Sequence, residues 1–341
     1  MKKSNAKQCL FHSVLSTVLS LAPVLFLGAS PLLLTKTAAA SCENRLSARE
    51  ISDLLQKGSE VSISTANSSL TTYELRQLAT QGRVGQFTIN VNNNRLSTYE
   101  LRQIAESGAR LTVALSSTEF SSYDLRQISE ASKSNQFEVF ADSPRLSSYD
   151  LKQIREARGK INVIASKTQL SAYDIRSIAG DGNFGSVKLT ANNKNYSSYD
   201  LRQIREAGVE LKISSESAGL SAYDLRQIAD GSRPDQVAVF VDGNSLSAYD
   251  LRQIRDAGAN LILSTSKTSL SEYDLRQIAS GSRRGQVEVQ VDDKRFSSYD
   301  LNQLADSGSR LLIHREKSGL SEYDLRQLAQ KQNVSIIDCL P

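Results

Sequence analysis

The chain has 341 residues, with 41 basic and 37 acidic side chains, two histidines, three cysteines and no tryptophan. This scarcity excludes a metal site built from histidine and cysteine, because several such ligands must converge on one ion. It also leaves little material for a histidine-dependent catalytic centre.

Residues 1–40 have the pattern of an N-terminal leader segment that is not part of the folded domain. Lys2, Lys3 and Lys7 precede an apolar run from about residue 14 to residue 34, and three alanines stand before Ser41. This is typical of a secretory signal peptide, which leaves residues 41–341 as a single repeat domain. The apolar run is also long enough for a retained membrane anchor. We expect a protein that is secreted, periplasmic or held in the cell envelope.

The charge balance changes once the leader is removed. Residues 1–40 hold four lysines and no acidic residue, so the remainder has 37 basic and 37 acidic side chains. A nucleic-acid partner would need a surplus of basic residues, and is therefore excluded. A protein or a cell-surface polymer is the expected partner, and a membrane only if the leader is retained.

One nine-residue phrase occurs twelve times in residues 41–341. The step from one copy to the next alternates between a shorter and a longer length, the longer having two more residues. A fixed period of about 25 residues predicts a solenoid, in which each repeat buries its apolar face against its neighbours. The copies begin at Leu46, Leu70, Leu96, Phe120, Leu146, Leu170, Tyr196, Leu220, Leu246, Leu270, Phe296 and Leu320.

The phrase predicts a short helix. In the copy at residues 246–254, Ser247 is a good N-cap and Asp250 stands three residues later, as in a capping box. The leucine before the cap and Leu251 have the spacing of a hydrophobic staple. Gly258 can end the helix in a left-handed conformation. A helix of about ten residues is too short to be stable alone, so packing must hold it.

Tyr249 of the same copy has two interpretations. Stacked repeats would place each Tyr, Asp and Arg beside its counterpart, so we expect lateral contacts and hydrogen bonds of a structural kind. Alternatively, eleven tyrosines form a regular array for a polymeric ligand, which requires exposed rings.

Short alternating runs follow the helices and predict strands. Examples are residues 87–91, 111–113, 237–241 and 287–291. Their β-branched residues and their alternation indicate one buried face. Equivalent strands separated by helices run parallel through right-handed crossovers, with every helix on one side of the sheet.

The second face of these strands decides between an open solenoid and a closed barrel. A closed β/α barrel packs both strand faces in its core, whereas this face is polar. The sequence therefore predicts an open, right-handed β/α horseshoe of about twelve repeats, with the sheet on its concave side and the helices on its convex side. The first repeat, with Arg49 in place of tyrosine, suits a terminal cap. The polar strand residues are Thr88, Asn90, Glu138, Lys188, Lys212, Glu288 and Gln290.

Alternate repeats differ at two turns. Long repeats insert two residues between helix and strand, as at 281–286, which makes a pair of repeats the structural unit. After the strand, long repeats carry Asn or Asp and the others carry Ser or Glu. These side chains predict a row that bonds neighbouring backbone, and a row of calcium sites is the alternative. The positions are Asn92, Asp142, Asn192, Asp242, Asp292, and Ser116, Ser166, Glu216, Ser266, Glu316.

The strand at Phe87–Asn92 resembles the L-x-L-x-x-N core of leucine-rich repeats, and Val187–Asn192 does so as well. The alternating repeat length is similar to that of the ribonuclease-inhibitor-like branch. The resemblance implies a horseshoe whose concave parallel sheet binds other macromolecules. It is one of architecture, because the Tyr-Asp-Leu-Arg-Gln-Ile phrase is no part of that consensus.

Catalytic chemistry finds little support. His314 is the one histidine after the leader, and we expect it to be a surface residue. Cys42 and Cys339 stand at opposite ends of the repeats, where an open horseshoe would keep them too far apart for a disulfide. We therefore expect no cofactor and no enzymatic activity.

The sequence favours a secreted binding scaffold that uses its concave strand residues. They vary between repeats while the helix phrase does not, and the two phenylalanines among them are candidate anchors. The alternative is a structural envelope or surface-layer component that self-associates. The candidate binding residues are Thr88, Asn90, Glu138, Phe140, Asn162, Ile164, Lys188, Thr190, Phe240, Ile262, Glu288 and Gln290.

Overall fold

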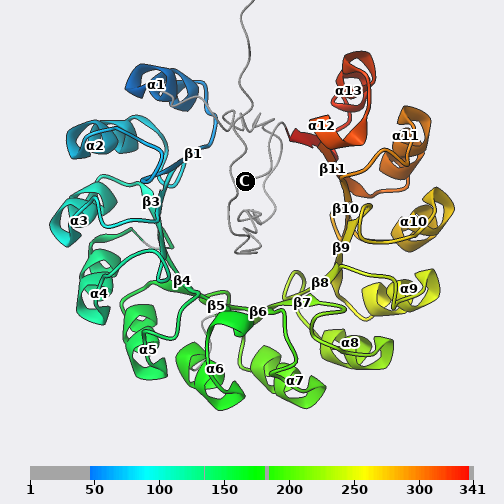
Figure 1. Cartoon of the computed structure of the whole chain (residues 1–341), viewed down its shortest axis with the longest axis horizontal. Coiled ribbons are helices and arrows are strands. Elements are labelled where there is room, and N and C mark those ends of the chain that lie inside the picture. The colour runs from blue at the N-terminus through cyan, green and yellow to red at the C-terminus, as the bar shows by residue number, and fades with distance from the viewer. Residues whose placement is uncertain (1–46, 134, 181–183, 338–341) are drawn as a thin grey trace, which may run out of the picture. The chain divides into compact units, whose positions relative to one another are not determined.

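A computed structural model of the chain describes residues 47–133, 135–180 and 184–337. Within them, twelve parallel strands form one sheet in which β1 to β12 follow chain order. Its two edge strands, β1 and β12, do not pair with each other in this part of the chain, so the sheet is open. Figure 1 shows the strands on the inside of a curved array and the helices on its outside. The predicted open β/α solenoid is therefore confirmed.

Each strand follows a helix. The strands are β1 (Val61–Ser64), β2 (Phe87–Val91), β3 (Arg110–Ala114), β4 (Phe137–Ala141), β5 (Lys160–Ile164), β6 (Val187–Ala191), β7 (Glu210–Ser214), β8 (Val237–Val241), β9 (Asn260–Ser264), β10 (Val287–Val291), β11 (Arg310–His314) and β12 (Val334–Ile337). The helices are α1 (Ala48–Gln56), α2 (Thr72–Gln81), α3 (Thr98–Glu106), α4 (Ser122–Ala131), α5 (Ser148–Glu156), η1 (Ala165–Lys167), α6 (Ala172–Ala179), α7 (Ser198–Glu206), α8 (Ala222–Ala229), α9 (Ala248–Asp256), α10 (Glu272–Ala279), α11 (Ser298–Asp306), α12 (Arg315–Ser318) and α13 (Glu322–Leu328).

The predicted capping box is present at the start of every α-helix from α1 to α11. At α9 the Asp250 N–H donates to Ser247 Oγ over 3.2 Å, and the Ser247 N–H donates to Asp250 Oδ2 over 3.0 Å. Two backbone donors that the helix itself leaves unpaired are thereby satisfied. Gly258 has a φ of +115°, which ends the helix as predicted.

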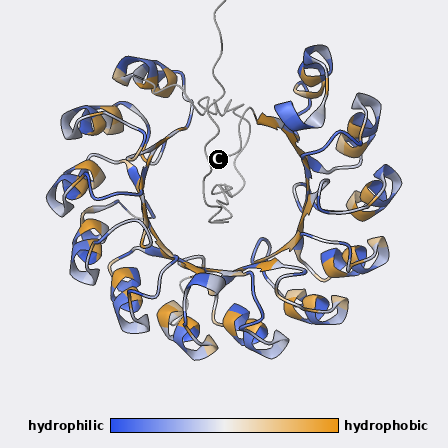
Figure 2. Cartoon of the chain, in the orientation of Figure 1, coloured by the Kyte–Doolittle hydropathy of each residue, from blue (hydrophilic) through white to orange (hydrophobic). Residues whose placement is uncertain are grey.

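The apolar residues of the phrase form the core between sheet and helices. Leu251 and Ile254 are fully buried, as is Val239 of β8. Figure 2 shows that the strands are largely hydrophobic and that each helix has a hydrophobic and a hydrophilic side. Because each repeat contacts mainly the next, this core is continuous along the sheet.

Strands of the two repeat lengths bury different positions. In the long repeats the first, third and fifth strand residues are buried, as in Val187, Leu189 and Ala191 of β6. In the short repeats the second and fourth residues are buried, as in Leu211 and Ile213 of β7. The remaining side chains point away from the helices and form the concave face.

The two extra residues of the long repeats form a turn before the strand, where the sequence placed them. The Gln86 N–H donates to the Arg83 carbonyl over 2.9 Å, which closes a four-residue turn. Gly85 has a φ of +79° at its third position, as a type II turn requires. Asn135, Gly185, Asp235 and Gly285 have positive φ at the same place.

The predicted leader, its boundary with the repeats, and both Cys42 and Cys339 lie outside the described residues. The single-domain assignment of residues 41–341 therefore stays a prediction. Among the residues that the structure describes, no helix has the length and apolarity needed to span a membrane.

Leu251→Ala is expected to destabilise the protein, because it leaves a cavity in the fully buried core. The expected loss in free energy of unfolding is about 2–5 kcal/mol, measured by urea denaturation followed by circular dichroism. Tyr249→Ala, on the exposed side of the same helix, is the control and should change stability by less than about 0.5 kcal/mol. Equal effects of the two substitutions would contradict the packing described above.

The capping carboxylates predict a loss of stability in acid. The Ser221 hydroxyl holds the pKa of Asp224 below its ordinary value of 3.8, and the Ser221 N–H and the Ser198 hydroxyl of the neighbouring helix act in the same direction. A carboxyl with a lower pKa in the folded chain stabilises the fold above its unfolded pKa, and that contribution is lost as the pH falls through the folded pKa.

Asp224→Asn is therefore expected to destabilise the protein at neutral pH and to cost progressively less as the pH falls below about 3.9. Chemical denaturation of both proteins across this range measures the difference. A cost that stays constant with pH would show that ionisation of the cap does not contribute to stability.

Candidate functional site

The concave face carries its polar side chains in rows that cross the sheet. The second residue of each long strand pairs with the first residue of the short strand that follows it. This register places Glu138 beside Lys160, Lys188 beside Glu210, and Glu288 beside Arg310. Opposite charges thus stand side by side within three of the repeat pairs.

Two of these three pairs of neighbours form ion pairs within the sheet. Lys188 Nζ lies 3.4 Å from Glu210 Oε2, and Arg310 Nη1 lies 3.6 Å from Glu288 Oε2. Gln290 Nε2 also donates to Glu288 Oε1 over 3.1 Å. Glu288, one of the polar residues from which an open strand face was predicted, is only 5% exposed and so has little contact with solvent. Its neighbours cover it and satisfy its charge.

Burial on this face also changes the titration of two lysines. Desolvation lowers the pKa of Lys160, and the charge of Lys188 lowers it further. Lys212 has a lowered pKa from the same two causes, in the same order. Because desolvation penalises the charged form, the middle of the concave face is a less polar environment than bulk solvent.

A second row on the concave face is partly apolar. Phe140 pairs with Ala114 on one side and Asn162 on the other, and Phe240 pairs with Ser214 and Ile262. Both phenylalanines are half-buried. Phe140 is therefore flanked by a small and a polar neighbour, and Phe240 by a small polar and an apolar neighbour.

The twelve predicted binding residues all lie on the concave face, but they do not converge on one pocket. They extend from β2 to β10. Thr88 and Glu288 are buried and the others are half-buried. Neighbouring strands lie only about 4.8 Å apart, so each side chain covers part of the next. Their assignment to binding remains a prediction.

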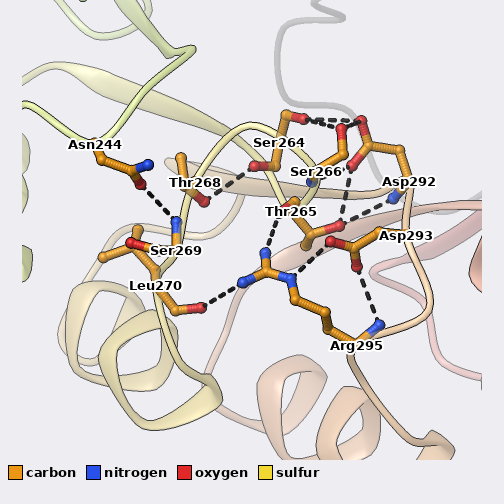
Figure 3. A network of polar contacts seen from close by, with 10 residues as sticks. All are labelled: Asn244, Ser264, Thr265, Ser266, Thr268, Ser269, Leu270, Asp292, Asp293 and Arg295. Carbon is orange, nitrogen blue, oxygen red and sulfur yellow. Dashed lines mark hydrogen bonds and ion pairs between the residues drawn. The ribbon is translucent and has the colours of Figure 1, made fainter.

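The predicted row of Asn and Asp residues after the long strands is present and is structural. Asp292 Oδ1 accepts from the Ser266 N–H over 2.8 Å and from Thr265 Oγ1 over 3.0 Å. Asp292 Oδ2 accepts from the hydroxyls of Ser264 and Ser266 (Figure 3). The backbone contact recurs at Asn92, Asp142, Asn192 and Asp242. These oxygens bind donors of the preceding repeat, as the turn interpretation expected. In the described part of the chain, no cluster of three His, Cys, Asp or Glu residues could hold a metal ion.

A glutamine before the long strands makes a matching contact at the other turn, which sequence reasoning missed. Gln286 Nε2 donates to the carbonyls of Arg255 and Ala259 over 2.8 and 3.1 Å. Its Oε1 accepts from the Arg283 N–H over 3.0 Å. Gln86 and Gln236 repeat this arrangement. The recurrence of glutamine at the same place in most of the long repeats was the available signal.

Arginines near the ends of two helices of the short repeats, α7 and α9, were also missed. Arg255 is 7% exposed, and its guanidinium donates to the carbonyls of Ile278 and Ser280 at the end of the next helix. Arg205 makes the same contact with Ile228 and Asp230. A cation at this position donates to carbonyls at the C-terminal end of the next helix, which have no partner within that helix. It also interacts favourably with the partial negative charge of that helix end.

The expected lateral hydrogen bonds form at acidic and arginine residues of the phrase, such as Glu100, Asp124 and Arg76, but the expectation was wrong for the tyrosines. Eleven of them are between 60% and 73% exposed. Where the residue before a tyrosine has a hydroxyl, it can bond the capping carboxylate of the next helix, as Thr72 Oγ1 does with Glu100 Oε1 over 2.6 Å and Thr98 Oγ1 does with Asp124 Oδ1 over 3.0 Å. A hydroxyl at this position reaches the neighbouring cap, whereas the tyrosine points outward.

The prediction for His314 was also wrong. This residue ends β11 beside Ile337 and is 8% exposed. Desolvation lowers its pKa, although the nearby Asp292 acts in the opposite direction. The side chain is therefore a buried element of the last repeats and not a surface residue.

No family model and no curated protein sequence matches the chain. Among solved structures, the leucine-rich repeat-containing protein LegL7 from Legionella pneumophila is 16% identical, with a TM-score of 0.50. The match covers 80% of this chain and 99% of that one. The fold is therefore that of a leucine-rich-repeat-like solenoid, as the strands at Phe87–Asn92 and Val187–Asn192 predicted.

Two other matches have TM-scores too low to bear on the fold. The aldolase QR15 is 11% identical, with a TM-score of 0.21, over 81% of this chain and 98% of that one. Dihydropteroate synthase of Xanthomonas albilineans is 11% identical, with a TM-score of 0.25, over 79% of this chain and 90% of that one.

Gln286→Ala is expected to destabilise the fold, because it removes one hydrogen-bond donor from each of two carbonyls, of Arg255 and Ala259, and the acceptor of the Arg283 N–H. The expected loss is about 1–3 kcal/mol in the free energy of unfolding, measured by urea denaturation. Gln327→Ala is the matched control, since Gln327 is exposed and should be replaceable at little cost. A Gln286 variant as stable as the control would exclude a structural role for this contact.

Proposed function

We propose that the protein is a secreted, non-catalytic scaffold that binds a protein partner on its concave strand face. The leucine-rich-repeat-like fold supports this function, because such a fold displays a continuous surface built from many strands. The leader-like segment at residues 1–40 supports secretion to the cell surface or envelope.

The observation that carries the proposal is the pair of phenylalanines, Phe140 and Phe240. Both are half-buried on the concave face, where their surroundings are already partly desolvated. Aromatic anchors of this kind, enclosed by near-neutral contacts, contribute most of the binding energy in protein interfaces. Ion pairs within the sheet balance the charges of the concave face. Apolar contact and complementary shape are therefore the main contributions to the binding of a partner there.

The test compares the full chain with the double variant Phe140→Ala and Phe240→Ala. Each protein is immobilised and exposed to envelope extract, and captured proteins are identified and their affinities measured with purified material. A partner of the concave face should bind the double variant at least about tenfold more weakly.

Phe184→Ala is the matched control, since Phe184 is exposed on a turn outside the strands and its loss should leave affinity unchanged. Equal binding to the double variant and the wild type would exclude the concave face as the docking surface. Sedimentation that shows assembly of the pure protein, without a partner, would favour a structural surface-layer role instead.

A further inference from the structure

Eleven tyrosines form a row along the convex helices, one at the second residue of each helix from α2 to α11 and of α13. All eleven are at least 60% exposed, although large aromatic side chains are usually buried. The twelfth tyrosine of the chain, Tyr196, is 4% exposed and donates to the Leu170 carbonyl over 2.6 Å. The row consists of Tyr73, Tyr99, Tyr123, Tyr149, Tyr173, Tyr199, Tyr223, Tyr249, Tyr273, Tyr299 and Tyr323.

These exposed rings are not part of the core, so the fold does not require them. Duplication of an ancestral repeat does not by itself explain why the tyrosine is the same in eleven copies. The residue just before the ring has diverged to Ser, Thr, Ala or Glu in different copies. The concave strand residues have diverged further. Because these other positions outside the core changed while the more exposed tyrosine did not, an external contact accounts best for its uniformity.

Side chains of the same helix hold the rings in place. The guanidinium carbons of Arg202, Arg226 and Arg252 lie 5.6–5.9 Å from the ring centroids of the tyrosines three residues before them. Elsewhere Gln77 Nε2 donates to the Tyr73 hydroxyl over 2.5 Å. A ring fixed in this way loses little freedom when a ligand stacks on it.

A groove between α9 and α10 shows what such a ring is combined with. Its volume is about 340 Å³, and one aromatic side chain lines it together with polar groups. The guanidinium and amide groups supply donors, and the carboxylate, amide and hydroxyl oxygens supply acceptors. An aromatic face beside paired donors and acceptors suits a sugar ring, which has an apolar C–H face and hydroxyls at its rim. The lining includes Tyr249, Arg252, Gln253, Asp256, Gln277 and Ser280.

The placement of the row indicates a long, flexible ligand. The helices lie on the outside of the curved array (Figure 1), and a rigid partner can touch a convex surface over only a few helices. A flexible polymer can follow the whole row, and equal spacing of the rings matches a ligand with repeating units. Contact with many weak sites raises affinity through multivalency.

The charges of the row disfavour a phosphate polymer. Each tyrosine is followed directly by Asp or Glu, and ten of the eleven copies have Arg or Lys two residues after that acid, so the row has no surplus of positive charge. Hydrogen bonds from Ser121 and Ser171 lower the pKa of Asp124 and Asp174 respectively, so these two carboxyls are ionised at neutral pH. Although single-stranded nucleic acids also stack on aromatic rings, they require a surplus of positive charge along the backbone.

We propose that the tyrosine row of the convex helices binds a linear, uncharged polysaccharide whose sugar rings stack on successive tyrosines. This site is separate from the concave face, and the two surfaces are tested by different variants.

The test measures retardation of the full chain in native gels that contain hydroxyethyl cellulose, glycol chitin or dextran. Because the chain lacks tryptophan, tyrosine fluorescence reports binding in solution. At least one polymer should retard the protein and change its fluorescence saturably. The triple variant Tyr199→Ala, Tyr223→Ala and Tyr249→Ala should bind at least about tenfold more weakly, as expected when adjacent sites of a multivalent row are lost.

Two controls make the result specific. The corresponding triple Tyr→Phe variant keeps the rings and should retain most of the binding, and the double variant Phe140→Ala and Phe240→Ala should bind like the wild type. Circular dichroism checks that each variant is folded.

Failure of all three polymers to retard the protein, or equal retardation of the Tyr→Ala variant, would overturn the proposal. So would self-association that the Tyr→Ala variant abolishes, because the row would then bind a second copy. Stronger binding to single-stranded DNA than to any of the polysaccharides would also overturn it.

Discussion

The structure depends on a difference in spacing between its two layers. Parallel strands lie about 4.8 Å apart, whereas packed helices need about 8–10 Å. One helix for every strand can be packed only if the sheet curves with its strands inside. The same curvature crowds the strand side chains together and spreads the helix side chains apart. It thereby produces the half-buried concave residues and the tyrosines that are at least 60% exposed.

Polar contacts at the turns join neighbouring repeats in addition to the packing of the core. Gln286 before β10 and Asp292 after it both bond the repeat that precedes them. Arg255 of that preceding repeat reaches forward to the carbonyls at the end of α10. A short repeat and the long one after it are therefore joined at both rims and at the helix end. This explains why the repeating unit of the chain is a pair of helix phrases and not a single one.

Local chemistry made most of the fold predictable, because caps, staples and strand alternation act within a few residues of sequence. The Asn and Asp row was predictable because these residues recur at the same place after each long strand. Concave ion pairs were not, because they depend on strand register. Lys188 pairs with Glu210 and Val61 pairs with Phe87, so the separation of paired residues along the chain differs from one strand pair to another. Neither the register nor the burial of His314 follows from repeat length.

The two faces of the molecule differ in how their residues vary, and this difference bears on what each face can recognise. A specific partner is distinguished by contacts that differ along the surface, such as Phe140 beside Asn162 and Phe240 beside Ile262. A row of identical contacts carries no such information and gains only from being long. A single protein partner would account for the varying strand residues but not for the uniform tyrosines, and a single repeating polymer would account for the tyrosines but not for the variation on the strands. The variable sheet therefore suits a single protein surface, and the uniform helices suit a polymer of repeating units.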